Sequence, residues 1–135
     1  MKIEAVVACE SIELQGELAT LVKVHNGTIL ENLPKQLPLC FFILIKAEAG
    51  EISKSYNLKV SIISPSQDQF LNLLEMSDFS LKSERNEIRL MGEMLFIQFG
   101  SYTLRISIDN KVLYNEAIYT VSKIQQPAAL PQSSI

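Results

Sequence analysis

Apolar residues occupy both faces of one stretch of the chain, Cys40–Lys46, which reads Cys-Phe-Phe-Ile-Leu-Ile-Lys. Successive side chains of an extended strand point to opposite faces, so Phe42 and Leu44 lie on one face and their apolar neighbours lie on the other. A strand with one wet face alternates apolar with polar residues, and this stretch does not. The pattern therefore predicts a central strand that is buried on both sides and around which the other strands are arranged.

Several other stretches do alternate apolar with polar residues. Residues 56–62 and 102–108 show the cleanest alternation, and residues 3–8 read as an opening strand. Gly16 tolerates left-handed backbone angles and predicts a tight hairpin that returns through residues 18–24. We expect an all-β sandwich of about seven to nine strands with at most one short helix.

Two features predict the connections before the central strand. Asn26-Gly27 is the strongest two-residue turn signal in the chain, because both residue types accept left-handed backbone angles. Pro34 and Pro38 fix their own φ angles and push the preceding residues toward extended geometry. We therefore expect a turn at Asn26-Gly27 and a rigid loop leading into the central strand.

Residues 67–83 carry an ambiguous pattern. Their apolar residues have helical spacing, and Ser66 with Gln69 fits a capping box, yet an irregular edge strand also fits. We favour a brief helical turn that leads into an edge strand near residues 79–81.

Composition and charge limit the partners and the location of the protein. The chain has 135 residues, of which 47% are hydrophobic, and a formal net charge of −3 without any cluster of lysine or arginine. These features argue against nucleic acid and anionic membranes as partners. No apolar run approaches a membrane span, and Glu4 and Glu10 shorten the first apolar run too much for a signal peptide, so we expect a cytoplasmic protein. In that setting Cys9 and Cys40 are expected to be buried, reduced thiols.

Four stretches share their pattern with a known family. They are an opening strand ending in Cys9-Glu10, a proline-bounded entry to the aromatic strand, Leu58-x-Val60-x-Ile62-x-Ser64-Pro65, and Gly100-x-Tyr102-x-Leu104-x-Ile106-x-Ile108-Asp109-Asn110. Together they resemble a family of small bacterial proteins of unknown function that are built as single immunoglobulin-like β-sandwiches. The resemblance implies an immunoglobulin-like antiparallel β-sandwich in which Tyr102 is the aromatic corner that opens a late strand. It implies no catalytic residues.

Few residues are candidates for chemistry. His25, the only histidine, adjoins the predicted turn, where we expect it to face solvent. Glu48 and Glu51 form a carboxylate pair of the kind that glycoside hydrolysis uses, but acidic residues around a glycine are typical of a solvated turn. The tyrosines either pack against the core or form an aromatic platform; they are Tyr56, Tyr102, Tyr114 and Tyr119. We predict no catalytic, metal-binding or cofactor-binding residues, and no enzyme.

The chain has more apolar surface than a two-sheet sandwich buries. Besides the outer face of the central strand, the apolar run at residues 94–97 must place some side chains outside. Residues 70–74, the tail or another subunit are the candidates for covering them. We divide the chain into a sandwich at residues 1–122 and a Pro/Gln/Ser-rich tail at residues 123–135.

We therefore expect a homo-oligomer or a complex with a protein partner. The predicted interface residues are Phe42, Leu44, Phe96, Leu130 and Ile135. The predicted function is a non-enzymatic protein-interaction module, an adaptor or accessory subunit of a bacterial assembly. The alternative is a small-molecule or carbohydrate binding protein with a tyrosine-lined cleft.

Overall fold

The computed structural model describes residues 1–125. These residues form eleven strands and one turn of 3-10 helix, η1 (Ala49–Glu51). The strands are β1 (Lys2–Gln15), β2 (Leu18–Val24), β3 (Gly27–Leu30), β4 (Lys35–Pro38), β5 (Cys40–Lys46), β6 (Ser55–Ile63), β7 (Phe70–Ser80), β8 (Arg85–Leu90), β9 (Glu93–Phe96), β10 (Gly100–Ile108) and β11 (Lys111–Lys123). The all-β prediction is confirmed, but the number of strands is higher than predicted. A strand of four residues, such as β4, is too short to show a recognisable alternation of apolar and polar residues. β4 lies where we predicted only a rigid loop.

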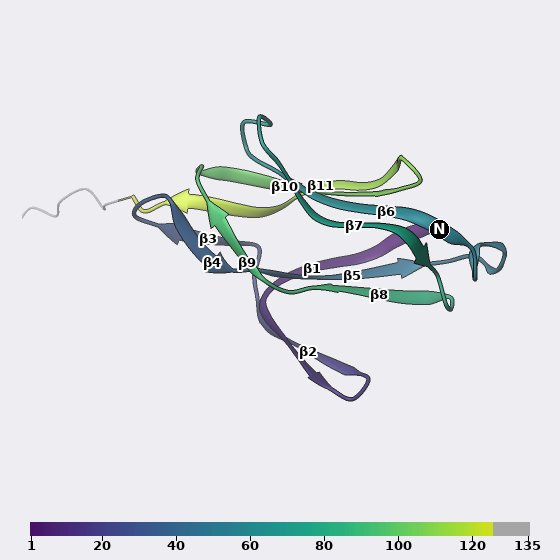
Figure 1. Ribbon diagram of the computed structural model, residues 1–135. Coiled ribbons are helices and arrows are strands. Elements are labelled where there is room, and N and C mark those ends of the chain that lie inside the picture. The colour runs from purple at the N-terminus through teal and green to yellow at the C-terminus, as the bar shows by residue number, and fades with distance from the viewer. Residues whose placement is uncertain (126–135) are drawn as a thin grey trace, which may run out of the picture.

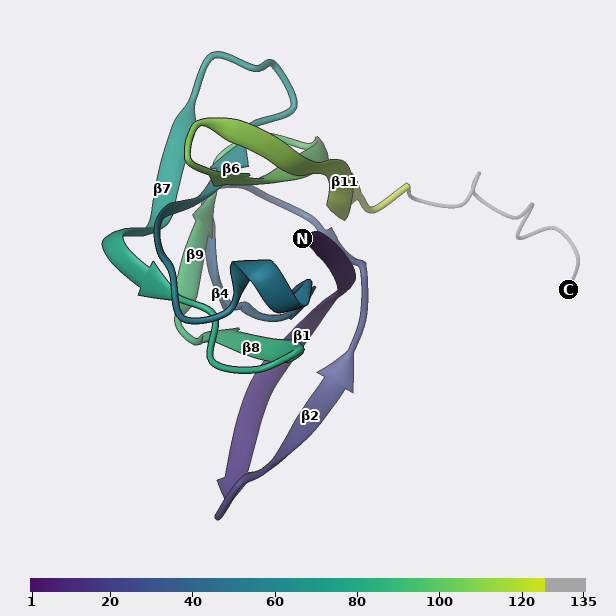
Figure 2. The same cartoon turned by 90° about the vertical axis from the view of Figure 1, so that its right-hand side faces the viewer.

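Two sheets are stacked as layers (Figures 1 and 2). The first has the strand order β2-β1-β5-β8, and the second has the order β3-β11-β10-β6-β7. Neighbouring strands are antiparallel except for β3 and β11, which are parallel. The ribbon of β4 and β9 lies at one end of the layers. The protein is therefore a β-sandwich, and the immunoglobulin-like type remains a prediction.

The central position of β5 is confirmed. It pairs with β1 on one side and with β8 on the other. Ile43 and Ile45 are fully buried between the two sheets, whereas Phe42 and Leu44 on the opposite face are half-buried. Both faces of the strand are thus withdrawn from water, one of them only in part.

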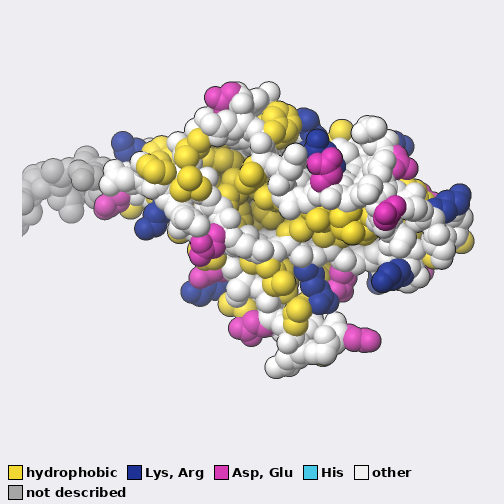
Figure 3. Space-filling view, viewed as in Figure 1, with side chains coloured by type: hydrophobic (Ala, Val, Ile, Leu, Met, Phe, Trp, Pro, Cys, Tyr) yellow, Lys and Arg dark blue, Asp and Glu magenta, His cyan; other side chains and the backbone are white. Residues whose placement is uncertain are grey.

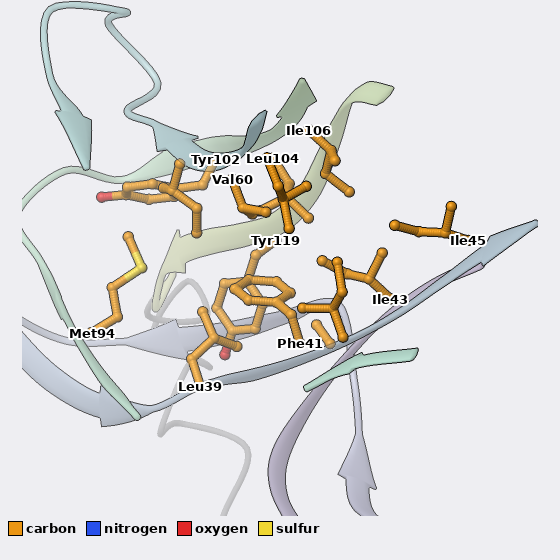
Figure 4. Close-up of a cluster of buried hydrophobic side chains, with 14 of the residues drawn as sticks. Leu39, Phe41, Ile43, Ile45, Val60, Met94, Tyr102, Leu104, Ile106 and Tyr119 are labelled. Atoms are coloured by element: carbon orange, nitrogen blue, oxygen red, sulfur yellow. The ribbon is translucent and has the colours of Figure 1, made fainter. Parts of the chain in front are cut away.

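The main core is built from the inner faces of both sheets. Figure 4 shows Phe41 and Ile43 of β5 pointing toward Leu104 and Ile106 of β10. Phe96 packs into the same core against the rings of Tyr102 and Tyr119, whose centroids lie 5.2 and 5.4 Å from its own. Phe96 is fully buried, so our assignment of Phe96 to an interface was wrong. In β9 the alternation places Met94 and Phe96 inside and leaves Leu95 outside.

Residues 70–80 form the strand β7, so the helical turn that we favoured is wrong. β7 pairs with β6 along its length, with register shifts at two points. The chain reverses before it at Gln67, which has a φ of 64°, and the backbone pairing to β6 outweighs the helical spacing of the leucines. β7 belongs to the sheet that does not contain β5. It therefore does not cover the outer face of β5, contrary to one of our alternatives.

The hairpin predicted at Gly16 is confirmed and forms a projection, which we call the arm (residues 10–24). Gly16 has a φ of 62°, and β1 and β2 pair up to Gln15 and Leu18. Figures 1 and 2 both show the arm extending away from the stacked layers. A second apolar cluster at its base contains Cys9, Ile12 and Cys40, and Phe42 packs against it. The arm thus partly covers the outer face of β5.

Asn26-Gly27 does not close a hairpin. The chain passes here from one sheet to the other, and β3 pairs in parallel with β11. Thr120 donates its backbone N–H to the carbonyl of Asn26 at 2.9 Å. A Cβ on Gly27 would lie 2.5 Å from the carbonyl oxygen of Thr120. Glycine is therefore required for close backbone approach, and our interpretation of this dipeptide as a turn was wrong.

We expect Gly27→Ala to lower the free energy of unfolding by about 1–3 kcal/mol, because β3 must move away from β11. Urea denaturation monitored by circular dichroism measures the effect. Gly92→Ala is the matched control, since a Cβ there meets no atom within 4 Å, and it should change stability by less than about 0.5 kcal/mol. Equal stabilities of the two variants would contradict the close-approach explanation.

Tyr102 forms a corner between β9 and β10. Its hydroxyl donates to the carbonyl of Gln98 at 2.7 Å and accepts from the N–H of Gln98 at 3.2 Å, while its ring is buried. Tyr102→Phe leaves both backbone groups without this partner and should cost about 1–2 kcal/mol of unfolding free energy. Tyr114→Phe is the control, because the half-buried hydroxyl of Tyr114 makes no hydrogen bond within residues 1–125. A loss as large in the control, measured by the same urea titration, would refute the role of this corner.

Candidate functional site

The structure disperses the predicted interface residues. Phe42 and Leu44 share the outer face of β5 and are half-buried, while Phe96 lies in the core. Leu130 and Ile135 lie outside the described residues. These residues therefore do not form one surface, and the apolar surface of the protein has to be located from the side chains that are exposed.

A groove runs along the side of the sandwich between β7 and the β8–β9 segment. Three adjoining cavities of about 800, 450 and 500 Å³ form it. The first two share Arg89 and Leu90, and the last two share Leu71 and Met94. Buried core residues line its floor, among them Leu58. The groove is therefore an opening toward the core between the last strands of the two sheets.

Exposed apolar side chains gather around this groove. Phe70 and Leu95 are 58% and 56% exposed and line the same cavity. The other exposed apolar residues that line the groove are Leu71, Met76, Met91 and Ile97. In Figure 3 hydrophobic side chains cover much of this side of the molecule, around a hollow and along a band beside it. The groove region is thus the largest collection of exposed apolar side chains in the described part of the chain.

The groove is bordered by the edges of two sheets. Within residues 1–125, β7 pairs only with β6, and β8 pairs only with β5. Their outer edges therefore present backbone N–H and C=O groups to the groove side without a neighbouring strand. β7 is eleven residues long, which makes its free edge long compared with most strands.

Hydrogen bonds fix one end of the groove. The carboxylate of Asp68 accepts from the hydroxyls of Ser66 and Ser64 and from the side-chain amide of Gln98, at 3.0 Å for Ser64 and 3.3 Å for Gln98. Hydrogen bonds from Ser66, Ser64 and Gln98, in that order of size, lower the pKa of Asp68. The network links the β6–β7 loop to the β9–β10 loop across the groove end. It was not visible in the sequence, because Asp68 and Gln98 are 30 residues apart.

The residues considered for chemistry have structural contacts. His25, predicted to face solvent, is partly buried: its ring donates through Nδ1 to the carbonyl of Gly27 at 3.1 Å and packs edge-on against Tyr119. Glu51 accepts from the backbone N–H of Glu48 at 2.8 Å and pairs with the amino group of Met1, and the pKa of Glu51 is lowered chiefly by that amino group. His25 and Glu51 therefore each make contacts that hold parts of the fold together.

The cysteines and tyrosines follow the packing alternatives. Cys9 and Cys40 are free, buried and opposite each other on β1 and β5, as predicted for reduced thiols. Burial, and after it the neighbouring thiol of Cys40, raise the pKa of Cys9. Tyr102 and Tyr119 are buried in the core. Tyr56 lines one cavity and Tyr102 lines another.

Comparisons of the chain with protein-family models, with curated proteins and with solved structures find no match. The resemblance to a bacterial family of unknown function therefore remains a prediction. None of the helical segments in the described part of the chain has the length and apolar character that a membrane span requires.

We expect Asp68→Asn to reduce stability at pH 7 and to weaken its dependence on acid. A lowered pKa in the folded state means that the charged carboxylate stabilises the fold above its unfolded pKa of about 4 and that this contribution is lost as the pH falls through the folded pKa. Thermal melting at pH 7 and at about pH 2 should show a smaller difference for the variant than for the wild type. Asp78→Asn, an exposed change on β7, should retain the wild-type difference. The same difference for Asp68→Asn would contradict the network.

Proposed function

We propose that the protein is a non-enzymatic protein-interaction module that binds an extended segment of a partner protein along the groove between β7 and β8. One observation carries the proposal: a groove with exposed apolar side chains along its rim is bordered on both sides by strand edges that are free within residues 1–125. A strand of the partner would hydrogen-bond to such an edge while its alternate side chains enter the groove.

The sequence of β7 supports this use of the edge. Proteins commonly protect exposed edges with lysine or proline, and β7 contains neither over its eleven residues, Phe70–Ser80. Register shifts against β6 do twist β7, but they leave its outer edge long. An edge of this kind is suited to accept a further strand.

The apolar rim indicates the chemistry of the partner. The exposed side chains at the groove, such as Leu71, Leu95 and Met91, would each contribute about 1.5–3 kcal/mol if a partner buried them fully. The charged residues beside them have both signs, including Asp78, Arg85 and Glu87. The rim therefore favours a partner segment with alternating apolar residues and little net charge. We also propose that the protein is an adaptor or accessory subunit of a cytoplasmic bacterial assembly.

Selection from a displayed library of random peptides tests the groove. Peptides of about ten residues, which span roughly 33 Å when extended, should be enriched for apolar residues at every second position. Leu71→Glu should weaken their binding at least about tenfold, because Leu71 lines two of the three cavities. Two methylated versions of a selected peptide give a second test, one methylated at its odd-numbered backbone nitrogens and the other at its even-numbered ones. Only one of the two versions should lose binding, since strand addition uses the N–H groups on one side of the peptide.

Ile29→Glu is the matched control. Ile29 is an exposed apolar residue of β3, which lies at the far edge of the sheet that ends in β7. The control should bind the selected peptides as the wild type does. Absence of enriched peptides, or peptides whose binding survives Leu71→Glu, would rule out the groove as the binding site.

A further inference from the structure

β2 is a further free edge, besides those of β7 and β8, and it lies on the arm. Within residues 1–125 β2 pairs only with β1. Its residues are unusually exposed for an apolar strand: Leu18 is 74% exposed, and Val24 is 60% exposed. Figure 2 shows β2 on the outside of the arm, away from the stacked layers. A strand from another molecule would therefore meet no other strand of residues 1–125 along the edge of β2.

The chemistry of β2 is self-complementary about Thr20. The stretch at residues 17–23 reads Glu-Leu-Ala-Thr-Leu-Val-Lys. When a second copy pairs antiparallel with Thr20 opposite Thr20, Glu17 comes opposite Lys23 at both ends. Glu17 lies in the turn before β2, and Lys23 has a φ of 54°, so the long side chains, rather than regular strand pairs, bring these charges together. Between them, apolar residues face apolar residues on both sides of the centre. Opposite charges, threonine pairs and apolar pairs across two strands all stabilise a sheet.

Only one register has this property. Hydrogen-bonded and non-hydrogen-bonded pairs alternate along two antiparallel strands. A two-fold axis between identical strands must therefore lie between two copies of the same residue. The neighbouring registers are those that place Leu21 or Ala19, instead of Thr20, on the axis. Centring on Leu21 sets Lys23 opposite Ala19, and centring on Ala19 sets Glu17 opposite Leu21. Each alternative leaves one of the two charges facing an apolar side chain and separates Glu17 from Lys23. The pairing centred on Thr20 is therefore favoured by charge and by packing together.

We infer that two copies of this chain associate through their β2 edges, with Thr20 on the two-fold axis and Glu17 of each copy paired with Lys23 of the other. The four-stranded sheets of the two copies then continue into one another across the axis. Within each chain, Nζ of Lys23 lies 3.5 Å from Oε2 of Glu10, and both side chains are exposed. In the dimer it lies between that carboxylate and Glu17 of the second copy.

The contact is small. A seven-residue strand edge falls among interfaces below about 1,200 Å², which are typical of weak and transient association. The dimer is therefore reversible and depends on concentration. This inference does not rest on the groove, because β2 and β8 are opposite edges of the same sheet.

Sedimentation equilibrium of the full chain, over about three decades of concentration, tests the inference. The wild type should shift from monomer to dimer mass. Lys23→Glu and Glu17→Lys should each raise the dissociation constant at least about tenfold, because like charges then face each other at both ends. An equimolar mixture of the two variants restores the opposite charges and should form a heterodimer. The double variant Glu17→Lys/Lys23→Glu should dimerise by itself.

Lys35→Glu makes the same charge change on β4, outside the arm, and should dimerise as the wild type does, as should Leu71→Glu in the groove. Circular dichroism confirms that each variant is folded. A wild type that stays monomeric throughout, or a dimer that persists in Lys23→Glu, would overturn the inference. So would folded charge variants that fail to associate when mixed.

Discussion

The burial of both faces of β5 is the constraint on which the rest of the structure depends. Its inner residues, such as Ile43, lose contact with water only because a second sheet lies over them. Its outer residue Phe42 needs a different cover, and the base of the arm supplies one through Cys9 and Ile12. The stacked sheets and the projecting arm thus follow from the same apolar stretch, which a single pair of sheets cannot bury.

The two sheets cover the inner face of β5, but their edge strands β7 and β8 do not pair with each other. The first sheet ends at β8 and the second ends at β7, and the ribbon of β4 and β9 fills the space between them only at one end. Along the rest of that side the core is reached through the groove. Apolar residues such as Leu71 and Leu95 remain at its rim, where folding of this chain leaves them exposed. Surplus apolar surface in the sequence is therefore concentrated where two strand edges are free.

Alternation predicted the strands that have one wet face, because burial and period are directly linked there. It did not predict which residues of the apolar run at residues 94–97 point inward, since four consecutive apolar residues contain no phase. Phe96 was thereby placed outside and Leu95 was not chosen. The first part of β7 was assigned to a helical turn for a related reason: leucines three and four residues apart fit a helix, and only the pairing with β6 shows that they belong to the edge strand. Asn26-Gly27 was interpreted as a turn because of its backbone preferences, but Gly27 is needed for close contact with a strand that is distant in the sequence.

The two free regions lie at opposite ends of one sheet, and this arrangement has a functional consequence. The order β2-β1-β5-β8 places the β2 edge and the β8 side of the groove on opposite borders of the sheet. In the dimer inferred above, pairing through β2 would therefore leave both grooves open. Two weak grooves held in one particle bind a partner that carries two matching segments far more tightly than one groove does, because the second contact becomes intramolecular. For the proposed adaptor function a weak strand-edge dimer would then be sufficient, since a bivalent partner engaging both grooves would also stabilise the contact between the arms.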